Sequence, residues 1–564
     1  MSESVIECVP NFSEGRDPAV IEAIAAAIRS VDGAKLLDVD PGKSTNRTVY
    51  TFAGSPSSVL EAAFQAAKIG KDLIDMRAHH GEHPRFGFLD VCPLIPISNC
   101  SMEDCVGWAR ELSKRFANEL GMTIYNYGYA AATPERSDLS FVRSGEYEGL
   151  ADKLSRPEWR PDFGPATFNE RMGATAVGAR EILIAYNINL NTTSVRRANS
   201  VAFDVREKGR LKRIGDPIVG EIVRDAEGNA VYEPGVLKKV KGIGWFIKEY
   251  GICQVSMNLT NLEETPLHIA FDETVEKAAA RGIRVTGSEL VGLIPLQSML
   301  DAGRYFLHKQ RRSSGVSDAE LIKIAIRSLG LDELSPFDPK KKIIEYALEE
   351  GMDKRLVDLT VEGFVEETAS ESPAPGGGSI AATMGAMGAG LATMVANLSS
   401  HKRGWDERWE EFSNWAETGK SYYARLLKLI DEDTAAFDEL MACFGLPKGS
   451  DEEKAARAEA IQSATKQAVE VPLEVMQVAL ESMEVIRAMA EIGNPNSVSD
   501  AGVGALAARS AVMGAALNVK INCGSIEDKA FVNSSLQRAR TMSEQAGQLE
   551  SEILKIVDQR IASL

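Results

Sequence analysis

Three of the chain's 6 histidines stand together in the segment His79-His80-Gly81-Glu82-His83-Pro84-Arg85. Imidazole exchanges protons readily near neutral pH, so this segment is a candidate for general acid–base catalysis. His79 and His83 are four residues apart, which also suits metal binding. Gly81 and Pro84, however, disfavour the regular helix on which H-E-x-x-H metal sites are built. A solvated polar loop is the third interpretation, and the local residues leave all three open.

A carboxylate interrupts the apolar face of a long predicted helix in the second half of the chain. Spaced three and four residues apart, this face contains Tyr422, Leu426, Ile430, Asp433, Phe437 and Met441. Because such residues share one side of a helix, Asp433 should point into the protein, where it must be paired, hydrogen-bonded or protonated. It is a candidate acid–base group, with a structural aspartate that caps a neighbouring helix as the alternative. Asp431 lies off this face and is expected in solvent.

Two segments of the first half offer further polar groups. Asp38 and Asp40 leave a predicted strand on the same side. They could orient an imidazole or bind a substrate ammonium, and an Asx turn explains them equally well. The run Gly173–Arg180 offers flexible backbone amides and a guanidinium, which could form a cradle for a carboxylate or a flat heterocycle. An ordinary glycine-rich joint between subdomains is the alternative.

Two loops of the second half could face Asp433. Pro375–Ser379 precedes a predicted helix, whose N-terminal amides would favour an anion. Gly493–Asp500 precedes another predicted helix, with Ser499 or Asp500 as the expected cap. Simple turn and cap functions are the alternative for both loops.

The elements that position these residues change type along the chain. Up to about residue 330, β-branched or aromatic runs alternate with amphipathic helical segments, as in α/β domains. Strands are expected at 35–39, 47–53, 86–97, 182–190, 254–258 and 284–288, and helices at 18–30, 56–74, 102–120 and 272–281. Ser55 and Pro56 indicate the start of the second helix. The length predicts an N-terminal subdomain, 1–180, and a C-terminal subdomain, 181–329, which meet near Gly173–Arg180. The turn-rich stretch 206–235 is expected to be a surface loop or hairpin.

After a linker at 330–353, residues 354–564 predict an all-α helix bundle. Pro336 and Pro339 each disfavour helix at the residue before them. Long helices are expected at 405–441, 451–492, 500–518 and from 526 onward, with a break or kink at Pro472. The uncharged stretch 373–400 is long enough to span a membrane. Its richness in Gly and Ala, with little Leu, Ile or Phe, favours a helix buried inside a soluble bundle.

The composition excludes several classes of protein. Of the 564 residues, 44% are hydrophobic and 26% are charged, which excludes disorder or coiled coil over most of the length. The net charge of −18 is opposite in sign to that of a nucleic-acid-binding protein, but it is compatible with a local basic pocket for a small anion. Seven scattered cysteines without a C-x-x-C pair, and an N-terminus without a secretion signal, indicate a reduced, cytoplasmic protein.

Several motifs resemble those of the bifunctional formimidoyltransferase-cyclodeaminase family. Five motifs resemble those of the formiminotransferase domain: CVPNFSEG (8–15), LLDVDPGKSTNRTVYTF (36–52), GEHPRFGFLDVCP (81–93), GATAVGAR (173–180) and TGSELVGLIP (286–295). The linker LGLDELSPFDPKKKIIEY (329–346) resembles the family's connector. Three further motifs resemble those of the cyclodeaminase domain: APGGGS (374–379), Asp433-x-x-Ala-Phe437 and GNPNSVSD (493–500). These motifs extend over essentially the whole chain in the order of the family.

The resemblance implies two successive reactions of histidine degradation and one-carbon metabolism. A transferase would move the formimino group from N-formimino-L-glutamate to N5 of tetrahydrofolate. An ammonia lyase would then cyclise 5-formimino-tetrahydrofolate to 5,10-methenyl-tetrahydrofolate. Tetrahydrofolate, expected in polyglutamylated form, is a co-substrate, and no metal is expected. Alternatives on the same scaffold are a formyltransferase that uses N-formylglutamate and a methenyl-tetrahydrofolate cyclohydrolase. A noncatalytic scaffold with inherited pockets is an alternative of another class.

The resemblance also implies roles for particular residues. His83 would exchange the proton of the transfer step while Asp40 orients its imidazole. Asp433 would carry the proton of the cyclisation, a role for which Asp431 is the competitor. The residues expected to bind folate are Phe163, Gly164, Pro165, Gly173, Ala174, Gly178, Arg180, Gly376, Gly377, Gly378, Asn494 and Asp500.

The implied assembly is a cytoplasmic homo-oligomer, a ring of dimers, without nucleic-acid partners or membrane insertion. Local basic residues could retain the anionic polyglutamate tail while the folate passes between the sites. The candidates are Lys238, Lys239, Lys241, Lys402 and Arg403. The 206–235 loop looks longer than in the animal enzymes and could alter donor choice or subunit contacts.

Overall fold

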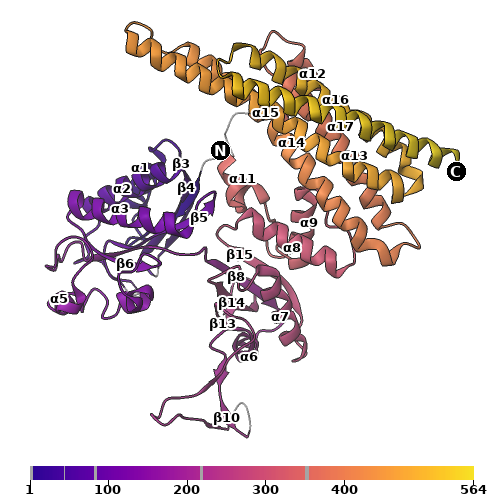
Figure 1. Ribbon diagram of the computed structural model, residues 1–564. Coiled ribbons are helices and arrows are strands. Elements are labelled where there is room, and N and C mark those ends of the chain that lie inside the picture. The colour runs from indigo at the N-terminus through magenta and orange to yellow at the C-terminus, as the bar shows by residue number, and fades with distance from the viewer. Residues whose placement is uncertain (1–3, 44, 82–84, 216–219, 350–354, 564) are drawn as a thin grey trace. The chain divides into compact units, whose positions relative to one another are not determined.

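The structure is a computed structural model that describes residues 4–43, 45–81, 85–215, 220–349 and 355–563. It confirms the predicted change from an α/β first half to an all-α second half (Figure 1). The chain forms two compact units, residues 1–299 with 326–350 and residues 300–325 with 351–564. The hairpin of α8 (Leu296–Lys309) and α9 (Asp318–Leu329) therefore contributes most of its residues to the second unit.

The first unit begins with a mixed seven-stranded sheet. Two short strands, β1 and β2, follow one another between β4 and β5, and β3 pairs with the other side of β4. β7 lies parallel to its two neighbours, β5 and β6. The strands are β1 (Val5–Cys8), β2 (Asn11–Phe12), β3 (Ala34–Gly42), β4 (Arg47–Gly54), β5 (Leu89–Ser98), β6 (Thr123–Gly128) and β7 (Ala174–Ala179).

Three long helices cover one face of this sheet. They are α1 (Pro18–Arg29), α2 (Pro56–Leu73) and α3 (Met102–Leu120), and they share an apolar core with Ile6, Cys8 and Tyr50 of the strands. The predicted start of α2 is confirmed, since the Ser55 side chain accepts a hydrogen bond from the Ser58 N–H. The opposite face has a smaller apolar cluster that includes residues of α4 (Leu139–Val142) and α5 (Leu150–Leu154).

The prediction of a glycine-rich joint at Gly173–Arg180 is wrong. Residues 174–179 form β7, which is buried along its whole length between β5 and β6. Small side chains are required there, because a Cβ on Gly178 would lie 2.5 Å from the Tyr127 carbonyl oxygen. Glycine and alanine are depleted in strands, which favoured the prediction of a turn, but packing between two parallel neighbours overrides that propensity. The backbone amides belong to the sheet and do not form a free cradle.

A four-stranded antiparallel sheet forms the rest of the first unit, in the order β13–β14–β8–β15. Its strands are β8 (Ile184–Leu190), β13 (Val240–Ile247), β14 (Ile252–Leu259) and β15 (Val285–Val291). α6 (Val195–Val205) packs against β13 and β14, and α7 (Leu267–Ala279) packs against α6 and β15. The linker contains α10 (Pro339–Lys342) and α11 (Ile344–Glu349).

The stretch 206–235 forms a hairpin in the part that the structure describes, as predicted. Its short paired strands are β9 (Arg210–Leu211) with β12 (Tyr232–Glu233) and β10 (Arg213–Ile214) with β11 (Glu221–Ile222).

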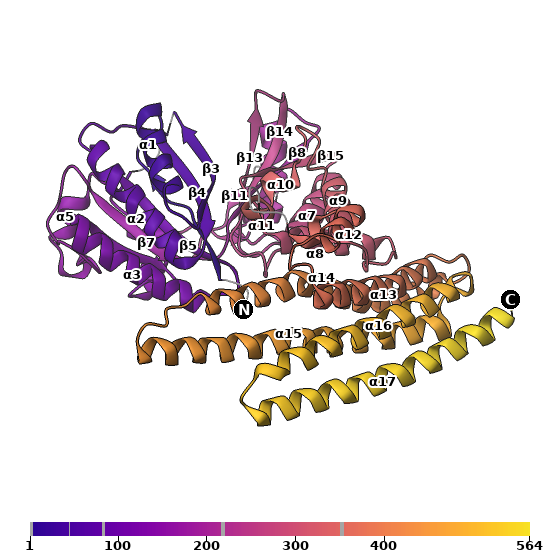
Figure 2. The ribbon, with the colours of Figure 1, turned by 90° about the horizontal axis from the view of Figure 1, so that it is seen from above.

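Long helices lying side by side form the bundle of the second unit (Figure 2). They are α13 (Gly377–Ser400), α14 (Trp409–Phe444), α15 (Asp451–Ile492), α16 (Val498–Asn522) and α17 (Lys529–Ala562), and the short helix α12 (Val361–Thr368) precedes them in the chain. Of the predicted break or kink at Pro472, the break is wrong, because α15 continues through this residue. Proline leaves the carbonyl of Ala468, four residues earlier, without its helical donor. The Asn522 Nδ2 atom of α16 donates to that oxygen at 2.6 Å and replaces the missing bond.

Two segments of the bundle, Gly377–Ser400 and Pro495–Ser525, are long and apolar enough to cross a membrane by composition, and 61% and 50% of their most hydrophobic windows are buried. α13 packs its small residues against α14, α15 and α16. Packing within the bundle therefore explains its apolar character.

Candidate active sites

The structure brings the predicted histidine segment beside the predicted aspartate turn. His79 Nε2 lies 2.7 Å from the Asn46 carbonyl oxygen, and Asn46 Nδ2 donates to the His80 carbonyl oxygen at 3.1 Å. A Cβ on Gly81 would lie 2.1 Å from a carbonyl oxygen of the same turn. These contacts hold residues 79–81 against the connection between β3 and β4. His83 lies outside the described residues, so its role stays a prediction.

His79 is buried and is engaged inside the fold. Burial lowers its pKa, and the hydrogen bond with the Asn46 backbone only partly opposes this shift. The Arg85 guanidinium donates to the His79 carbonyl oxygen and, at 2.8 Å, to the Met76 carbonyl oxygen. A neutral imidazole held by the backbone is suited to fixing this segment, which leaves the exchange of protons with a substrate to another group.

Asp38 and Asp40 lie on the edge strand β3, and both side chains are exposed. They pair across the strands with Thr51 and Val49, respectively, while Tyr50 between them points into the helix-covered core. Both carboxylates therefore lie on the face opposite to α1–α3, which confirms that they leave the strand on one side. Although the Asp38 side chain reaches solvent, partial desolvation against the sheet and, to a smaller extent, the neighbouring charge of Asp40 raise the pKa of its carboxyl.

The residues predicted to bind folate in the first unit are spread along β6 and β7. Phe163 bridges to β6, and Thr123 Oγ1 donates to the Pro165 carbonyl oxygen at 2.9 Å. Thr123 also lies opposite Ala174 on β7. The structure thus brings Phe163–Pro165 close to Ala174. Arg180 lies at the other end of β7, about 20 Å away at 3.3 Å per residue.

Gly164 and Gly173, also in this predicted folate set, are required by the backbone itself. Their φ angles are positive, 85° and 68°, a region that residues with a Cβ rarely adopt. A Cβ would also lie 2.0 Å from the Met122 carbonyl oxygen at Gly164 and 2.4 Å from the Phe86 carbonyl oxygen at Gly173. These requirements hold with or without a bound ligand.

In the second unit, Asp433 lies against the N-terminus of α13. Ser379 Oγ donates to Asp433 Oδ2 at 3.1 Å, and the Ser379 N–H also donates to this carboxylate. A Cβ on Gly378 would lie 2.1 Å from Asp433 Oδ1, so only glycine permits this approach. The positive end of the helix dipole stabilises a carboxylate placed here. The prediction that Pro375–Ser379 faces Asp433 is confirmed.

Burial nevertheless dominates the electrostatics of Asp433. It raises the pKa of the carboxyl, and the two hydrogen bonds from Ser379 oppose the shift only in part. A cavity of about 580 Å³ is lined by residues of α12, α13 and α14, and neither Asp433 nor Ser379 is among them. Its mostly apolar lining includes Ile380, which follows Ser379, and Ile430, one helical turn before Asp433. A carboxyl with a raised pKa, on one of the helices that line such a cavity, is suited to transferring a proton to or from a ligand.

The other predicted loop, Gly493–Asp500, lies at the far end of α13. The Asn494 N–H donates to Ser399 Oγ at 2.8 Å. Gly378 and Ser399 are about 30 Å apart along the helix at 1.5 Å per residue. The prediction that this loop faces Asp433 is therefore wrong within a single chain, because sequence motifs carry no information about which end of a long helix a later loop will reach.

Comparison with known proteins covers both units. Family models match in order: the formiminotransferase domain, N-terminal subdomain, at residues 5–180; the formiminotransferase domain at 185–349; and formiminotransferase-cyclodeaminase at 360–541. A formimidoyltransferase-cyclodeaminase of Mus musculus is 42% identical over 547 residues, which are 96% of this chain and 97% of the mouse protein. The chain belongs to the formimidoyltransferase-cyclodeaminase family.

Relatives also correspond to each half of this family member separately. A glutamate formimidoyltransferase of Thermoplasma acidophilum is 41% identical over 306 residues, covering 54% of this chain and 92% of that protein. A methenyltetrahydrofolate cyclohydrolase of Methylorubrum extorquens is 40% identical over 202 residues, covering 36% of this chain and 97% of that protein. The predicted family is thereby confirmed for both halves.

In this formimidoyltransferase-cyclodeaminase family member, Asp431 is partly buried and hydrogen-bonded, whereas the sequence predicts it in solvent. Its Oδ1 atom accepts a hydrogen bond from the Leu356 N–H at 2.8 Å, and burial raises the pKa of its carboxyl. Asp431 thus anchors a short 3-10 turn, Leu356–Asp358. Phe437 and Met441, predicted on the buried face, are 37% and 43% exposed. The apolar face of α14 therefore ends near Asp433.

The Asn494–Asp500 loop has the local structure of a turn and cap. Asn494 Oδ1 accepts a hydrogen bond from the Asn496 N–H at the start of a 3-10 turn. Ser497 is the N-cap residue of α16, so the prediction of Ser499 or Asp500 as the cap is wrong.

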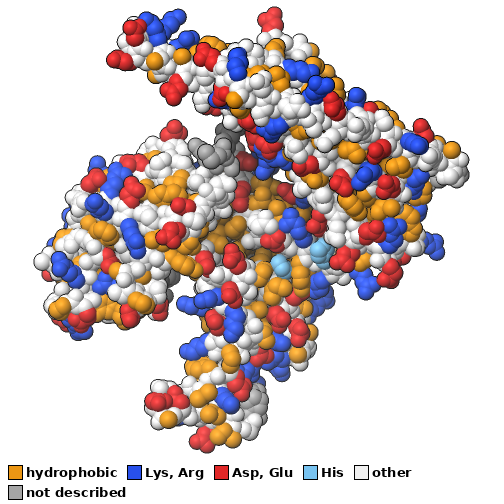
Figure 3. All heavy atoms as spheres, in the orientation of Figure 1, with side chains coloured by type: hydrophobic (Ala, Val, Ile, Leu, Met, Phe, Trp, Pro, Cys, Tyr) orange, Lys and Arg blue, Asp and Glu red, His pale blue; other side chains and the backbone are white. Residues whose placement is uncertain are grey.

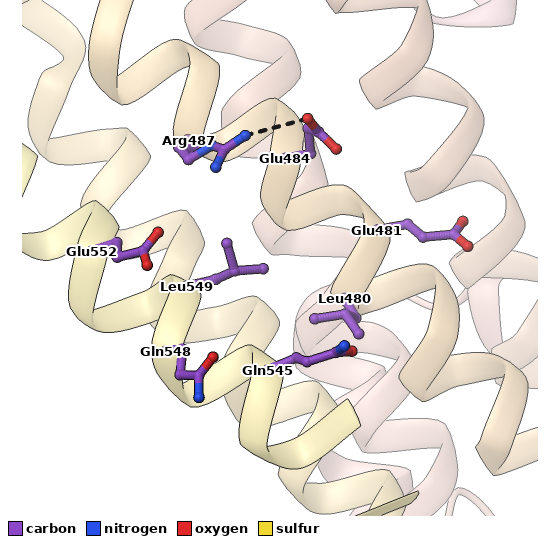
Figure 4. A pocket seen from close by; sticks show the side chains of 8 residues that line it. All are labelled: Leu480, Glu481, Glu484, Arg487, Gln545, Gln548, Leu549 and Glu552. Atoms are coloured by element: carbon purple, nitrogen blue, oxygen red, sulfur yellow. Dashed lines mark hydrogen bonds and ion pairs between the residues drawn. The ribbon is translucent and has the colours of Figure 1, made fainter. Parts of the chain in front are cut away.

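A separate polar groove of about 380 Å³ lies between α15 and α17 (Figure 4). Its lining residues are Leu480, Glu481, Glu484, Arg487, Gln545, Gln548, Leu549 and Glu552. Arg487 pairs with Glu484 at 3.3 Å, and no predicted catalytic residue lines this groove. Across the described ranges, no group of three or more His, Cys, Asp or Glu side chains is arranged to hold a metal ion.

Two polar side chains, one beside Asp433 and one in the first sheet, were not among the site residues that the sequence predicts. Ser379 holds the Asp433 carboxylate, and its signal in the sequence is a hydroxyl that follows three glycines before a helix. Glu7 is buried in the first sheet, and its signal is a single charge within the apolar strand Val5–Cys8.

Proposed function

We propose that this chain is a bifunctional enzyme of folate metabolism. It transfers the formimino group of N-formimino-L-glutamate to N5 of tetrahydrofolate and then cyclises the product to 5,10-methenyl-tetrahydrofolate. The observation that carries this proposal is the 42% identity to a bifunctional relative over 96% of the chain. Residues 1–180 and 181–329 form the transferase, 330–353 the linker and 354–564 the cyclodeaminase.

In the transfer step, N5 attacks the formimino carbon and the bond from that carbon to the glutamate nitrogen breaks. His83 accepts the proton of N5 and returns it to the departing glutamate nitrogen, while Asp40 orients the imidazole. Two observations support this assignment: residues 79–81 are held against the 45–46 turn, and Asp40 lies on the strand that leads into this turn. The folate would extend past Phe163–Pro165 and Gly173–Arg180.

In the cyclisation step, N10 attacks the same carbon and the bond to the formimino nitrogen breaks. Asp433 takes the proton of N10 and delivers it to the leaving ammonia. The raised pKa of Asp433 supports this role, since a carboxyl of ordinary pKa would return its proton to solvent before use. The α13 terminus, Gly376–Gly378, would position both the carboxylate and the folate.

The direct test follows absorbance of the methenyl product after formiminoglutamate and tetrahydrofolate are mixed with the purified chain. We expect the product with wild type. His83→Ala should abolish both product and glutamate release, whereas Asp433→Asn should release glutamate and accumulate 5-formimino-tetrahydrofolate. Replacing the donor with N-formylglutamate tests the formyltransferase alternative, which would be favoured by equal or faster glutamate release.

A second candidate activity for the bundle is hydrolysis of methenyl-tetrahydrofolate. The observation that favours it is the 40% identity to a methenyltetrahydrofolate cyclohydrolase over 202 residues. Asp433 would then activate water in place of N10. Decay of added methenyl-tetrahydrofolate, lost in Asp433→Asn, would support this activity, and a stable methenyl signal would contradict it.

We also propose that the chain forms a homo-oligomer, as a ring of dimers. α16 presents exposed apolar residues at intervals of three, four or seven positions, which place them on one side of the helix: Val503, Leu506, Met513, Leu517 and Ile521. Hydrophobic side chains are visible on the surface of the helical unit (Figure 3). Light scattering should give the mass of an oligomer, and Leu517→Glu with Ile521→Glu should lower it. Asn494 and Asp500 could then reach an Asp433 site only from another subunit.

The expected cellular setting is the cytoplasm, and the expected form of the co-substrate is polyglutamylated tetrahydrofolate. Fractionation of cells that express the tagged chain would test the first, and affinities for folates with one and five glutamates would test the second.

A further inference from the structure

Glu7 is a charged residue in the interior of the first sheet. β1 places it opposite Ala53 of β4 and Ile95 of β5. Its neighbours Ile6 and Cys8 belong to the core beneath α1–α3, so Glu7 points to the opposite face. That is also the face of Asp38 and Asp40. Only 4% of the surface of Glu7 is exposed.

The Glu7 carboxyl forms no hydrogen bond or ion pair within the part of the chain that the structure describes. The charged groups that act on it are Arg180 and Glu345. Arg180 is engaged elsewhere, since its Nη1 atom donates to the Glu181 carbonyl oxygen at 2.9 Å and its guanidinium bonds Tyr127. Burial raises the pKa of Glu7 to about 7 against the opposing charge of Arg180.

This combination differs from that of a structural carboxylate. Burying an ionisable group without a partner destabilises the folded protein, because the group loses its hydration and gains no hydrogen bond in return. Structural carboxylates recover this cost through caps or ion pairs, as Asp431 does with the amide of Leu356. A buried carboxyl that lacks such a partner, and whose pKa is shifted toward neutrality, is characteristic of a ligand site.

The position of Glu7 limits what the ligand can be. The strand register places Glu7 about 12 Å from Asp38 and about 16 Å from Asp40, at 3.3 Å per residue and 4.8 Å per strand. Glu7 is therefore too far to exchange a proton with a group at the turn after Asp40. A ligand that extends along this face could contact both places.

We propose that Glu7 is the receptor for a planar N–C–N edge that carries two N–H donors. The two carboxylate oxygens accept parallel hydrogen bonds from such an edge in the geometry used for guanidinium groups. If the proposed function holds, this edge is either that of the 2-amino group and N3 of the pterin or that of the protonated formimino group of the donor. The ligand supplies the hydrogen bonds that the protein does not.

The test measures binding and proton exchange together, by calorimetry at pH 7 in buffers of different ionisation enthalpy. The two probes are 5-formyl-tetrahydrofolate and formiminoglutamate, each added alone to the full chain. Because the pKa of Glu7 is about 7, half of the carboxyl is protonated before binding. Pairing with N–H donors should then release about half a proton.

Glu7→Gln should remove this proton release and weaken the probe that Glu7 contacts by tenfold or more, leaving the other probe unchanged. Which probe loses affinity identifies the edge. Glu22→Gln is the matched control, because Glu22 lies exposed on α1 and pairs only with Arg29 in the described chain. Its affinities and proton release should equal those of wild type.

Wild-type binding of both probes without proton exchange overturns the inference, even if Glu7→Gln fails to fold. Wild-type affinities and proton release in a folded Glu7→Gln overturn it as well. Failure of the proposed function is a separate result, because the calorimetry requires no turnover. If the chain binds a probe in a Glu7-dependent manner but forms no methenyl product, the assignment of Glu7 stands and the proposed reaction is contradicted.

Discussion

At the scale of single residues, the bundle site depends on a carboxylate that touches a helix terminus. Asp433 receives both the hydroxyl and the N–H of Ser379, and it comes within van der Waals contact of Gly378. The helix terminus favours the ionised form and burial favours the protonated form. Burial prevails, so the pKa is raised. The proton affinity of Asp433 depends on how closely α14 approaches the N-terminus of α13.

Gly378→Ala should disturb this approach, because the new methyl group would lie 2.1 Å from Asp433 Oδ1. We expect a loss of about 1–3 kcal/mol in the free energy of unfolding, as for overpacked sites, and a cyclisation rate at least tenfold lower. Gly390→Ala is the control on the same helix, since a Cβ there meets nothing within 4 Å. It should stabilise the chain by about 1 kcal/mol through helix propensity. Equal melting temperatures and rates for the two variants would contradict the prediction.

The direction of the pKa shift predicts how Asp433 affects stability. The folded-state pKa of Asp433 is raised. Its contribution to the free energy of unfolding is therefore complete below the unfolded-state pKa of about 4, and it is lost as the pH rises through the folded-state pKa. Asp433→Asn imitates the protonated form. Its melting temperature should match wild type near pH 4 and exceed it at pH 8, while the cyclisation rate falls by about 10²–10⁴-fold. A wild type that melts higher than this variant at pH 8 would show that the carboxylate is stabilised by an interaction other than those described.

At the scale of elements, long helices with regular apolar spacing could be predicted from the sequence. The predictions fail where a distant element supplies a hydrogen bond or a packing contact that the local sequence lacks. The start of α2 followed from Ser55 and Pro56 alone. The continuity of α15 through Pro472 could not be predicted, because the compensating donor is Asn522, 50 residues further along on α16. β7 could not be predicted either, because its small residues have low strand propensity and form a strand only by pairing with β5 and β6.

Asn522→Ala should therefore destabilise the bundle by leaving the Ala468 carbonyl oxygen without a donor. We expect a loss of about 1–3 kcal/mol, the cost of an unsatisfied buried group. Pro472→Ala restores the backbone N–H that normally serves this oxygen, so Asn522→Ala should cost less in that background. Denaturant unfolding of the two single variants and the double variant measures this coupling. Additive losses would show that Asn522 does not replace the missing helical bond.

The same scale explains which site contacts were predictable. A loop that directly precedes a helix must lie at that helix's N-terminus, so the position of Gly376–Gly378 beside a bundle-facing aspartate could be predicted. Which end of α13 the later Asn494 loop reaches depends on the path of α14 and α15, whose ends are set by packing. Glu7 was missed because a strand of four residues, Val5–Cys8, is too short for alternation to show which face is covered.

At the scale of the whole molecule, two units of different architecture act on one anionic intermediate. The chain carries a net charge of −18, which on average repels a polyglutamate tail. The proposed retention of a polyglutamylated folate between the two reactions would therefore need a local cationic surface. Lys402 and Arg403 follow His401, the C-cap of α13. The Lys402 ammonium lies 4.3 Å from the centre of the Trp405 ring, so its position is partly fixed.

Lys402→Gln with Arg403→Gln should thus weaken binding of pentaglutamyl tetrahydrofolate several-fold and leave the monoglutamyl form unchanged. The lag before methenyl product appears should lengthen for the pentaglutamate alone, because more of the intermediate escapes to solution. At 1 M salt, where the screening length is about 3 Å, variant and wild type should converge, since the remaining contacts are not ionic. Lys555→Gln, on the exposed surface of α17, is the matched control and should behave as wild type at every salt concentration. Unchanged pentaglutamate affinity in the double variant would assign retention to other cations, of which Lys238, Lys239 and Lys241 on the first unit are the next to replace.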